Sequence, residues 1–349
     1  MGTDVKVTGE GTKIYLKGVA PLDWGTGEMC EFAASLTRML ACVGEDVPYH
    51  TVMGVTGVAF RFSFGPELWN PGFYGFSGVA SDVGDLIRRA FSAVGHEYGW
   101  RPTCNRADDL KRITESIDRG VAVMLRGHVV DASDWALVTG YAEDGNTLIG
   151  SSPYGGKDRF NGFDLMPDWH ANTRETIVLG AKCPRPAPEE IHTDALKLAV
   201  RLMRTSADAE PYTGLNAYDM LISALRDEDY PEVAEREEDK PWFRYLCLLC
   251  YNMMLDDHKS APAFLRDAAA ALPTCSTELL QAAECYEQSG ILRDQLDTIL
   301  PGNFSQDAQR KVLDPAVREA FAQIILQIRD VEAVGIARIE KALGRAGVS

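Results

Sequence analysis

The sequence predicts an α+β domain over residues 1–185, followed by an all-helical domain over residues 190–349. Three observations predict this order. Helical periodicity dominates the first part of the chain, short β-rich stretches follow Gly120, and helical periodicity returns beyond a proline-rich joint at residues 183–190. Helices followed by antiparallel strands are typical of the α+β class, in which helices pack against one sheet. A length of 349 residues also fits two domains of ordinary size.

The N-terminal part begins with a strand, a break and a helix. Residues 13–19 (KIYLKGV) alternate as a strand does, and PLDWGTG then ends the strand with proline and glycine. A helix is predicted next by apolar side chains at spacings of three and four residues, and Gly44 ends it. These side chains are Met29, Phe32, Ala33, Leu36, Met39, Leu40 and Val43. Two more helices are predicted over residues 81–94 and 107–119.

The sheet is predicted after Gly120. VAVMLRG, WALVTGYAED, TLIGSS and TIVLGAK are short β-rich runs separated by turn residues such as EDGN, which is the pattern of a small antiparallel sheet. Residues 52–78 are rich in glycine, proline and aromatic side chains, and such a segment suits the wall of a cleft. Packing of the same aromatic side chains in a core is the alternative interpretation.

The C-terminal domain is expected to be helical throughout. Its expected helices cover residues 195–203, 217–225, 242–255 and 316–343. An apolar stripe on the last of them is expected to pack within its own domain. No repeat of fixed length is present, so a solenoid is not expected. Cys247 and Cys250 have the spacing of a zinc knuckle but lie inside an apolar helical run without a second close pair, so we expect no zinc and no cofactor.

Charge and composition exclude several classes of partner. The chain carries 51 acidic and 35 basic side chains, a net charge of -16, which repels phosphate backbones and anionic lipid surfaces. We therefore expect neither nucleic acid nor a membrane as a partner. The N-terminus lacks the basic start and apolar run of a signal peptide, and the eight scattered cysteines suit reduced thiols, so a cytoplasmic location is expected. The oligomeric state is left open.

One cysteine is placed for chemistry. GTGEMCEFAASLTRML puts Cys30 in the first turn of the predicted helix, where the helix dipole favours a thiolate. A nucleophilic cysteine also needs a partner base, and a buried structural cysteine is the alternative interpretation. No phosphate-binding loop, dinucleotide glycine pattern or HExxH motif occurs, which excludes kinase, dehydrogenase and metalloprotease interpretations.

The order of parts resembles the papain-like cysteine peptidase fold. Within that fold, the chain is similar to bacteriocin-processing peptidases and to the N-terminal domain of the butirosin-biosynthesis acyltransferase. The resemblance covers residues 13–182 and rests on MCEFAASLTRMLACVGEDVPYHTVMGVTG and DWALVTGYAEDGNTLIGSSPYGG. It implies a cysteine helix packed on an antiparallel sheet, and acyl transfer through a thioester by a Cys–His pair that an Asn or Asp orients.

The resemblance also assigns positions to single residues. Cys30 matches the nucleophile, while Asp134 stands where the family carries its histidine, Ser152 at the third catalytic position and Trp24 at the oxyanion glutamine. Three of these four positions therefore carry a different chemistry. An aspartate is an anion at pH 7, and an anion beside a thiol disfavours the thiolate.

Two functions are compatible with this altered site. Asp134 binds a cationic or amine group in the first, so that the Cys30 cleft binds a small molecule or peptide without Cys–His catalysis. In the alternative, His128 enters the cleft and forms a Cys30, His128, Asp134 set, which makes the protein an active cysteine-dependent hydrolase or acyltransferase on an amide or thioester. A structural interaction role is a third interpretation for the helical half. The ligand-binding candidates are Trp24, Arg61, Trp135 and Tyr154.

Overall fold

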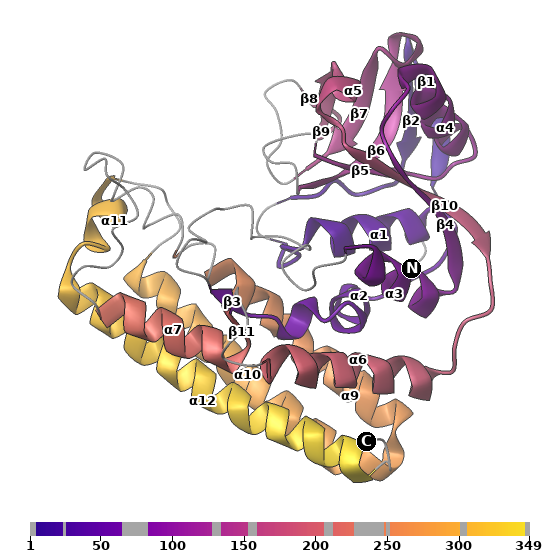
Figure 1. Ribbon diagram of the computed structural model, residues 1–349. Coiled ribbons are helices and arrows are strands. Elements are labelled where there is room, and N and C mark those ends of the chain that lie inside the picture. Colours follow the sequence, from indigo (N-terminus) through magenta and orange to yellow (C-terminus); the bar gives the residue numbers. More distant parts are fainter. Residues whose placement is uncertain are drawn as a thin grey trace. The chain divides into compact units, whose positions relative to one another are not determined.

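The computed structural model describes most of the chain, and Figure 1 labels its elements. The described residues are 5–23, 26–64, 83–127, 134–152, 159–205, 212–226, 248, 252–300 and 306–345. Contacts between residues divide the chain into two units. The first comprises residues 1–52 and 82–186, and the second comprises residues 53–81 and 187–349.

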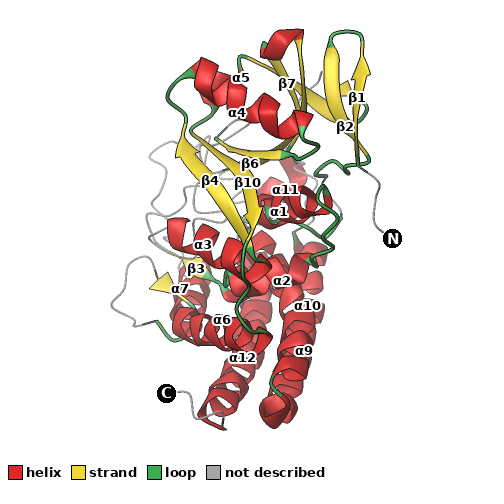
Figure 2. Cartoon of the chain, turned by 90° about the vertical axis from the view of Figure 1, so that its right-hand side faces the viewer, coloured by secondary structure: helices red, strands yellow, loops and turns green. Residues whose placement is uncertain are grey.

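A nine-stranded antiparallel sheet forms the first unit together with its helices (Figure 2). Seven strands follow the order β4-β10-β5-β6-β7-β9-β8, while β2 pairs with the second half of β6 and β1 pairs with β2. The strands are β1 (Lys6–Glu10), β2 (Lys13–Lys17), β4 (His96–Pro102), β5 (Val123–Arg126), β6 (Trp135–Ala142), β7 (Thr147–Ser151), β8 (Arg159–Phe160), β9 (Phe163–Pro167) and β10 (Glu175–Lys182). The β-rich runs that predicted an antiparallel sheet after Gly120 are β5, β6, β7 and β10, so this prediction is confirmed.

Helices cover the sheet around its central strand β6. The helices of the first unit are α1 (Glu31–Ala41), the start of α2 (Tyr49–Val55), α3 (Val83–Val94), α4 (Arg106–Asp118) and α5 (Trp169–Asn172), with the short 3-10 helix η4 (Glu143–Gly145). Both α1 and α4 contact β5 and β6. Along β6 both alternating sets of side chains are buried, which requires cover on both faces of the sheet.

The second unit is mainly helical, which confirms the predicted α+β class with a helical C-terminal region. Its elements are η1 (Val58–Phe60), β3 (Ser63–Phe64), α6 (Pro188–Met203), β11 (Tyr212–Thr213), α7 (Leu215–Arg226), η5 (His258–Ser260), α9 (Ala261–Ala271), η6 (Pro273–Cys275), α10 (Ser276–Ile299), α11 (Gln306–Lys311) and α12 (Pro315–Arg345). Most of the helix expected over residues 242–255 lies outside the described residues, as do Cys247 and Cys250. None of the helices in the described ranges is long and apolar enough to cross a membrane.

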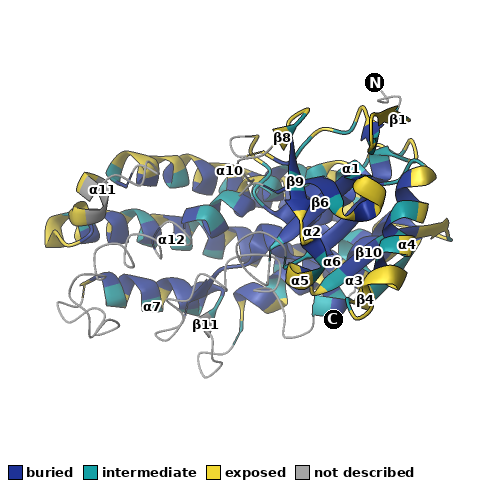
Figure 3. Cartoon of the chain, turned by 90° about the horizontal axis from the view of Figure 1, so that it is seen from above, coloured by how far each residue is buried: buried dark blue, intermediate teal, exposed yellow. Residues whose placement is uncertain are grey.

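The helix α12 packs along α10, α7 and α6 (Figure 1). Figure 3 colours these helices by burial, with exposed and buried residues around each of them. The predicted apolar stripe coincides only in part with the buried face of α12. Phe321 and Ile328 of the stripe are buried, but the charged residues Arg318 and Glu332 are buried as well. Two charged side chains are therefore enclosed in a helical core.

Residues 53–64 belong to the second unit, although the sequence analysis placed them in the N-terminal domain. Their aromatic rings pack with helices of that unit: Phe60 meets Tyr286 edge to face at 5.3 Å between ring centroids, and Phe62 stacks on Tyr218 at 4.0 Å. The strand β3 pairs with β11. For these described rings the structure shows core packing, the alternative that the sequence left open.

Candidate functional site

Cys30 lies immediately before the first residue of α1, whereas the sequence predicted it within the first turn of this helix. It has extended backbone angles, and its carbonyl accepts the first hydrogen bond of the helix from Ala34 N at 3.0 Å. Only 3% of Cys30 is exposed. The apolar spacing that predicted the helix buries Phe32, Leu36 and their neighbours against the sheet, and this packing fixes where the thiol sits.

The backbone N–H of Cys30 donates a hydrogen bond to the hydroxyl of Tyr49 at 2.9 Å. Tyr49 begins the helix α2, and its ring packs on the hydrophobic core of the first unit. This hydrogen bond occupies the backbone N–H of Cys30, which is the donor next to the thiol. Sequence reasoning missed Tyr49, because a tyrosine 19 residues after the cysteine forms no pattern that would single it out.

Asp134 directly precedes the strand β6, at the level of the first turn of α1. Its carbonyl accepts from Gly127 N at 2.8 Å, and the residue is half-buried. The next residue, Trp135, is 1% exposed and meets Phe32 edge to face at 5.3 Å between ring centroids. The start of β6 therefore lies against the start of α1, and the Trp135 ring is part of the packing that joins them.

Ser152 follows the last residue of β7 and is buried. In the ladder between β6 and β7, Leu137 is opposite Ser151, so the end of β7 lies beside the beginning of β6. The Ser151 hydroxyl accepts from Leu22 N at 2.8 Å and donates to Leu22 O at 3.0 Å, which ties the chain leading to α1 to the same place. Cys30, Asp134 and Ser152 are thus brought to one end of the sheet.

Carboxylates surround the start of α1 in this unit. Glu31 is the first helical residue and is 2% exposed, and Asp134 directly precedes Trp135 of β6, whose ring meets Phe32 of α1. An acidic side chain in the first turn of a helix is stabilised by the helix dipole. The same negative charge disfavours ionisation of a neighbouring thiol.

Arg61, expected among the ligand-binding residues, lies in the second unit and not in the unit of Cys30. Its guanidinium contacts the carboxylate of Asp257 at 2.9 Å, and both side chains are buried. The sequence left two roles open for Arg61, a ligand carboxylate or an ion pair within the protein, and the structure shows the ion pair. Alternation had placed Arg61 and the neighbouring Phe60 and Phe62 on opposite faces, but all three are buried because this segment is enclosed in the helical unit.

Three further predicted site residues, Trp24, His128 and Tyr154, lie outside the described residues. Two histidines of the first unit that the structure does describe already contact carboxylates: His96 Nε2 is 3.1 Å from Glu45, and His170 Nε2 is 3.3 Å from Asp109. Across the described ranges, no group of three or more His, Cys, Asp or Glu side chains could hold a metal ion.

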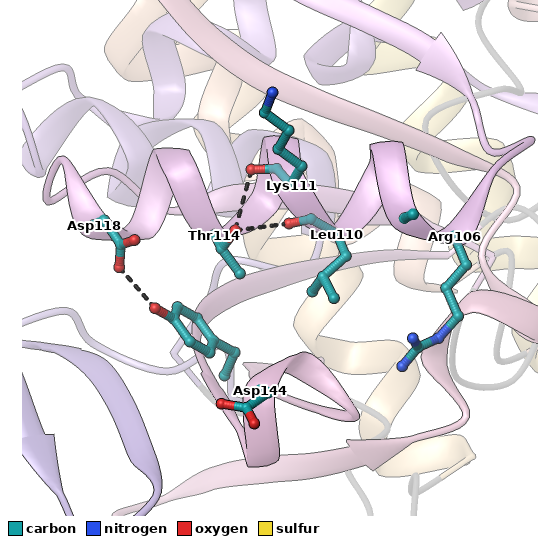
Figure 4. Close-up of a pocket in the computed structure, with 8 residues that line it drawn as sticks. Arg106, Leu110, Lys111, Thr114, Asp118 and Asp144 are labelled. Atoms are coloured by element: carbon teal, nitrogen blue, oxygen red, sulfur yellow. Dashed lines mark hydrogen bonds between the residues drawn. The ribbon is translucent and has the colours of Figure 1, made fainter.

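A separate groove lies between α4 and the end of β6 (Figure 4). It has a volume of about 540 Å³ and is lined by Arg106, Ala107, Leu110, Lys111, Thr114, Asp118, Tyr141 and Asp144. The Tyr141 hydroxyl donates to Asp118 at 2.9 Å, and burial together with that carboxylate raises the pKa of Tyr141 to about 12. None of the residues that the sequence analysis selected lines this groove.

The chain matches no known protein family and no curated protein. The candidate site at the start of α1 comprises a buried thiol, a backbone donor that is already hydrogen-bonded, a buried serine and two carboxylates.

Proposed function

We propose that the first unit is a papain-like domain with an altered site, which binds a small molecule or peptide at the start of α1 without Cys–His acyl transfer. A primary amine or other cationic group of the ligand pairs with Asp134. Cys30 serves as a buried contact beside it and not as the nucleophile.

The observation that carries this proposal is the hydrogen bond from Cys30 N–H to the Tyr49 hydroxyl. Acyl transfer by a thiolate passes through a tetrahedral intermediate, whose oxyanion needs preorganised donors such as backbone N–H groups. At a cysteine that precedes a helix, its own N–H is the donor nearest the thiol. Because Tyr49 accepts from this N–H at 2.9 Å, the donor is not directed at a substrate oxygen.

The charge around the thiol supports the same conclusion. Asp134 stands where the resemblance expects an imidazole, and Glu31 adds a second carboxylate in the first turn of α1. A carboxylate at the edge of a buried site attracts a cation and disfavours a thiolate. Amine recognition therefore suits these residues better than nucleophilic attack does.

A ligand screen with matched probes tests the proposal. The full chain is titrated with small primary amines and with short peptides that carry either a free or an acetylated N-terminus, and binding is followed by calorimetry. We expect binding of probes with a free amine, weakened at least about tenfold in Asp134→Asn, because loss of a close charge pair at a partly buried site is worth about 1.4 kcal/mol or more.

Asp168→Asn is the matched control, because Asp168 is an exposed carboxylate of the same unit whose positive φ of 55° asparagine also adopts. Binding should be unchanged in this variant. Equal binding of free and acetylated probes, or turnover of an amide or thioester probe that depends on Cys30, would contradict the proposal.

A further inference from the structure

A carboxylate is fully enclosed in the core of the second unit. Glu332 of α12 is 0% exposed and accepts three hydrogen bonds, from the Tyr218 hydroxyl at 2.7 Å, the Ser289 hydroxyl at 2.6 Å and His258 Nδ1 at 2.7 Å. These partners come from α7, α10 and η5. Three separate elements therefore converge on one buried acid.

His258 is held between two acceptors. Its Nδ1 faces Glu332, and its Nε2 lies 2.6 Å from the backbone carbonyl of Arg61. An ionised carboxylate and a carbonyl oxygen only accept hydrogen bonds, so both ring nitrogens must carry hydrogen and the ring is an imidazolium. Burial opposes this charge, but the Glu332 carboxylate outweighs burial, and the pKa of His258 lies above its ordinary value.

A second charge pair lies beside the first. Arg61 contacts Asp257 at 2.9 Å, with both side chains buried. The charged groups of the cluster are thus two cations, Arg61 and His258, and two carboxylates, Asp257 and Glu332, so their charges balance. Among the described residues, the phenol of Tyr218 contacts Glu332 and the ring of Tyr286 contacts His258, and burial raises the pKa of both tyrosines well above its ordinary value.

This cluster fastens one segment of chain. Arg61 contributes both its guanidinium and its carbonyl, and the next residue accepts a hydrogen bond at its carbonyl from Gly214 N at 2.7 Å. Further ties of residues 58–64 include apolar packing, the two-residue ladder between β3 and β11, and a contact of 3.7 Å from the Ser63 hydroxyl to the Met254 sulfur. Among these ties, the bond from His258 is the one that depends on the protonation of an imidazole ring.

We propose that the His258–Glu332 pair is a protonation-dependent latch that holds residues 58–64 in the second unit while His258 is charged. When the imidazolium loses its proton, the ring has one N–H left. Either Glu332 or the Arg61 carbonyl then faces a nitrogen lone pair at hydrogen-bond distance, and the cluster keeps one uncompensated negative charge in a dry core. Residues 58–64 loosen as a result, while the helices around them stay packed.

The full, unmodified chain tests the latch by hydrogen exchange between pH 6 and pH 9.5. After correction for base-catalysed exchange, the protection of peptides covering residues 58–64 should fall at least about tenfold across the titration of His258, because one buried hydrogen bond is lost. Peptides from α9 and from β6 should keep their protection, which separates the latch from general alkaline unfolding. Constant protection of residues 58–64 over this range would overturn the proposal.

Two variants sharpen the test. His258→Gln lacks the titrating proton, so residues 58–64 should show low protection that no longer depends on pH. His96→Gln is the control, because His96 is also buried and contacts a carboxylate, Glu45, but lies in the first unit. Should His258→Gln fail to fold, side-chain NMR of isotope-labelled histidines in the unmodified chain still decides. One buried histidine should titrate above the ordinary value of about 6.5, and the finding that every histidine titrates at or below that value would overturn the proposal.

Discussion

Gly54 and Gly290 are both helical glycines of the second unit, and replacement by alanine should change stability in opposite directions. A Cβ atom at Gly54 would lie 2.1 Å, 2.2 Å and 2.4 Å from three ring atoms of Phe264. Phe264 is 0% exposed on α9 and meets Phe60 edge to face, so its ring has no solvent to move into. To restore an ordinary contact of 3.4 Å, the ring would have to move by roughly 1.3 Å.

The change in the free energy of unfolding combines a cost of overpacking and a gain in helix propensity. Overpacking of a close-packed core costs about 1–3 kcal/mol, and alanine in a helix gains about 0.8–1 kcal/mol over glycine. Because three ring atoms are overlapped, we take the upper part of the first range, and Gly54→Ala should lower the free energy of unfolding by about 1–2 kcal/mol. At Gly290 the nearest atom to an added Cβ is Lys259 Cγ at 3.4 Å, so Gly290→Ala should gain about 0.5–1 kcal/mol.

Equilibrium unfolding in urea measures both variants. The midpoint for the transition of the second unit should fall in Gly54→Ala and rise in Gly290→Ala, with unchanged slopes. If Gly54→Ala were as stable as the parent chain, the packing of Phe264 against the end of α2 would be refuted.

Two further predictions concern single hydrogen-bonding groups. Tyr49→Phe removes the acceptor of Cys30 N–H and should lower the free energy of unfolding, measured in urea, by about 1–2 kcal/mol. The control Tyr98→Phe keeps a ring stacked on Phe91 and should change this free energy by less than about 0.5 kcal/mol. Equal effects of the two variants would contradict the role of the bond to Cys30. Burial raises the pKa of Asp257 from 3.8 to about 6, so the folded chain holds this proton more tightly than the unfolded chain. The parent should therefore gain stability over Asp257→Asn as the pH falls from 7 to 4, by up to about 3 kcal/mol, and a difference independent of pH would refute the assignment.

The elements with strong local periodicity could be predicted from the sequence. The helix after Cys30 has apolar side chains at spacings of three and four residues, and β5, β6 and β7 are buried at nearly every position, so short apolar runs between turn residues carry the signal. The strand β4 (His96–Pro102) was missed because it lies at the edge of the sheet, where only β10 pairs with it, and its sequence HEYGWRP mixes charged residues with glycine and proline.

Long-range placement could not be predicted in the same way. Apolar rings at residues 60, 62 and 64 show that the segment is buried, but a local pattern does not tell which core receives it. His258 and Glu332 are 74 residues apart, so no local pattern connects them. Within the sequence of α12, Glu332 cannot be distinguished from the exposed polar residues beside the apolar stripe. The bond from Cys30 to Tyr49 likewise depends on how α1 and α2 pack and not on any spacing.

The reactivity of Cys30 tests the central claim, that the site at the start of α1 is altered for binding, most directly. Iodoacetamide labelling of Cys30 is followed by mass spectrometry from pH 5 to pH 10, in the unmodified chain and in His128→Ala, with the exposed Cys104 as the internal reference for reagent decay. The proposed function predicts slow labelling with a midpoint at or above about pH 8.5, the ordinary value for a thiol, and no effect of His128→Ala. A midpoint near about pH 6 that rises in His128→Ala would show a thiolate paired with an imidazolium and an active cysteine enzyme.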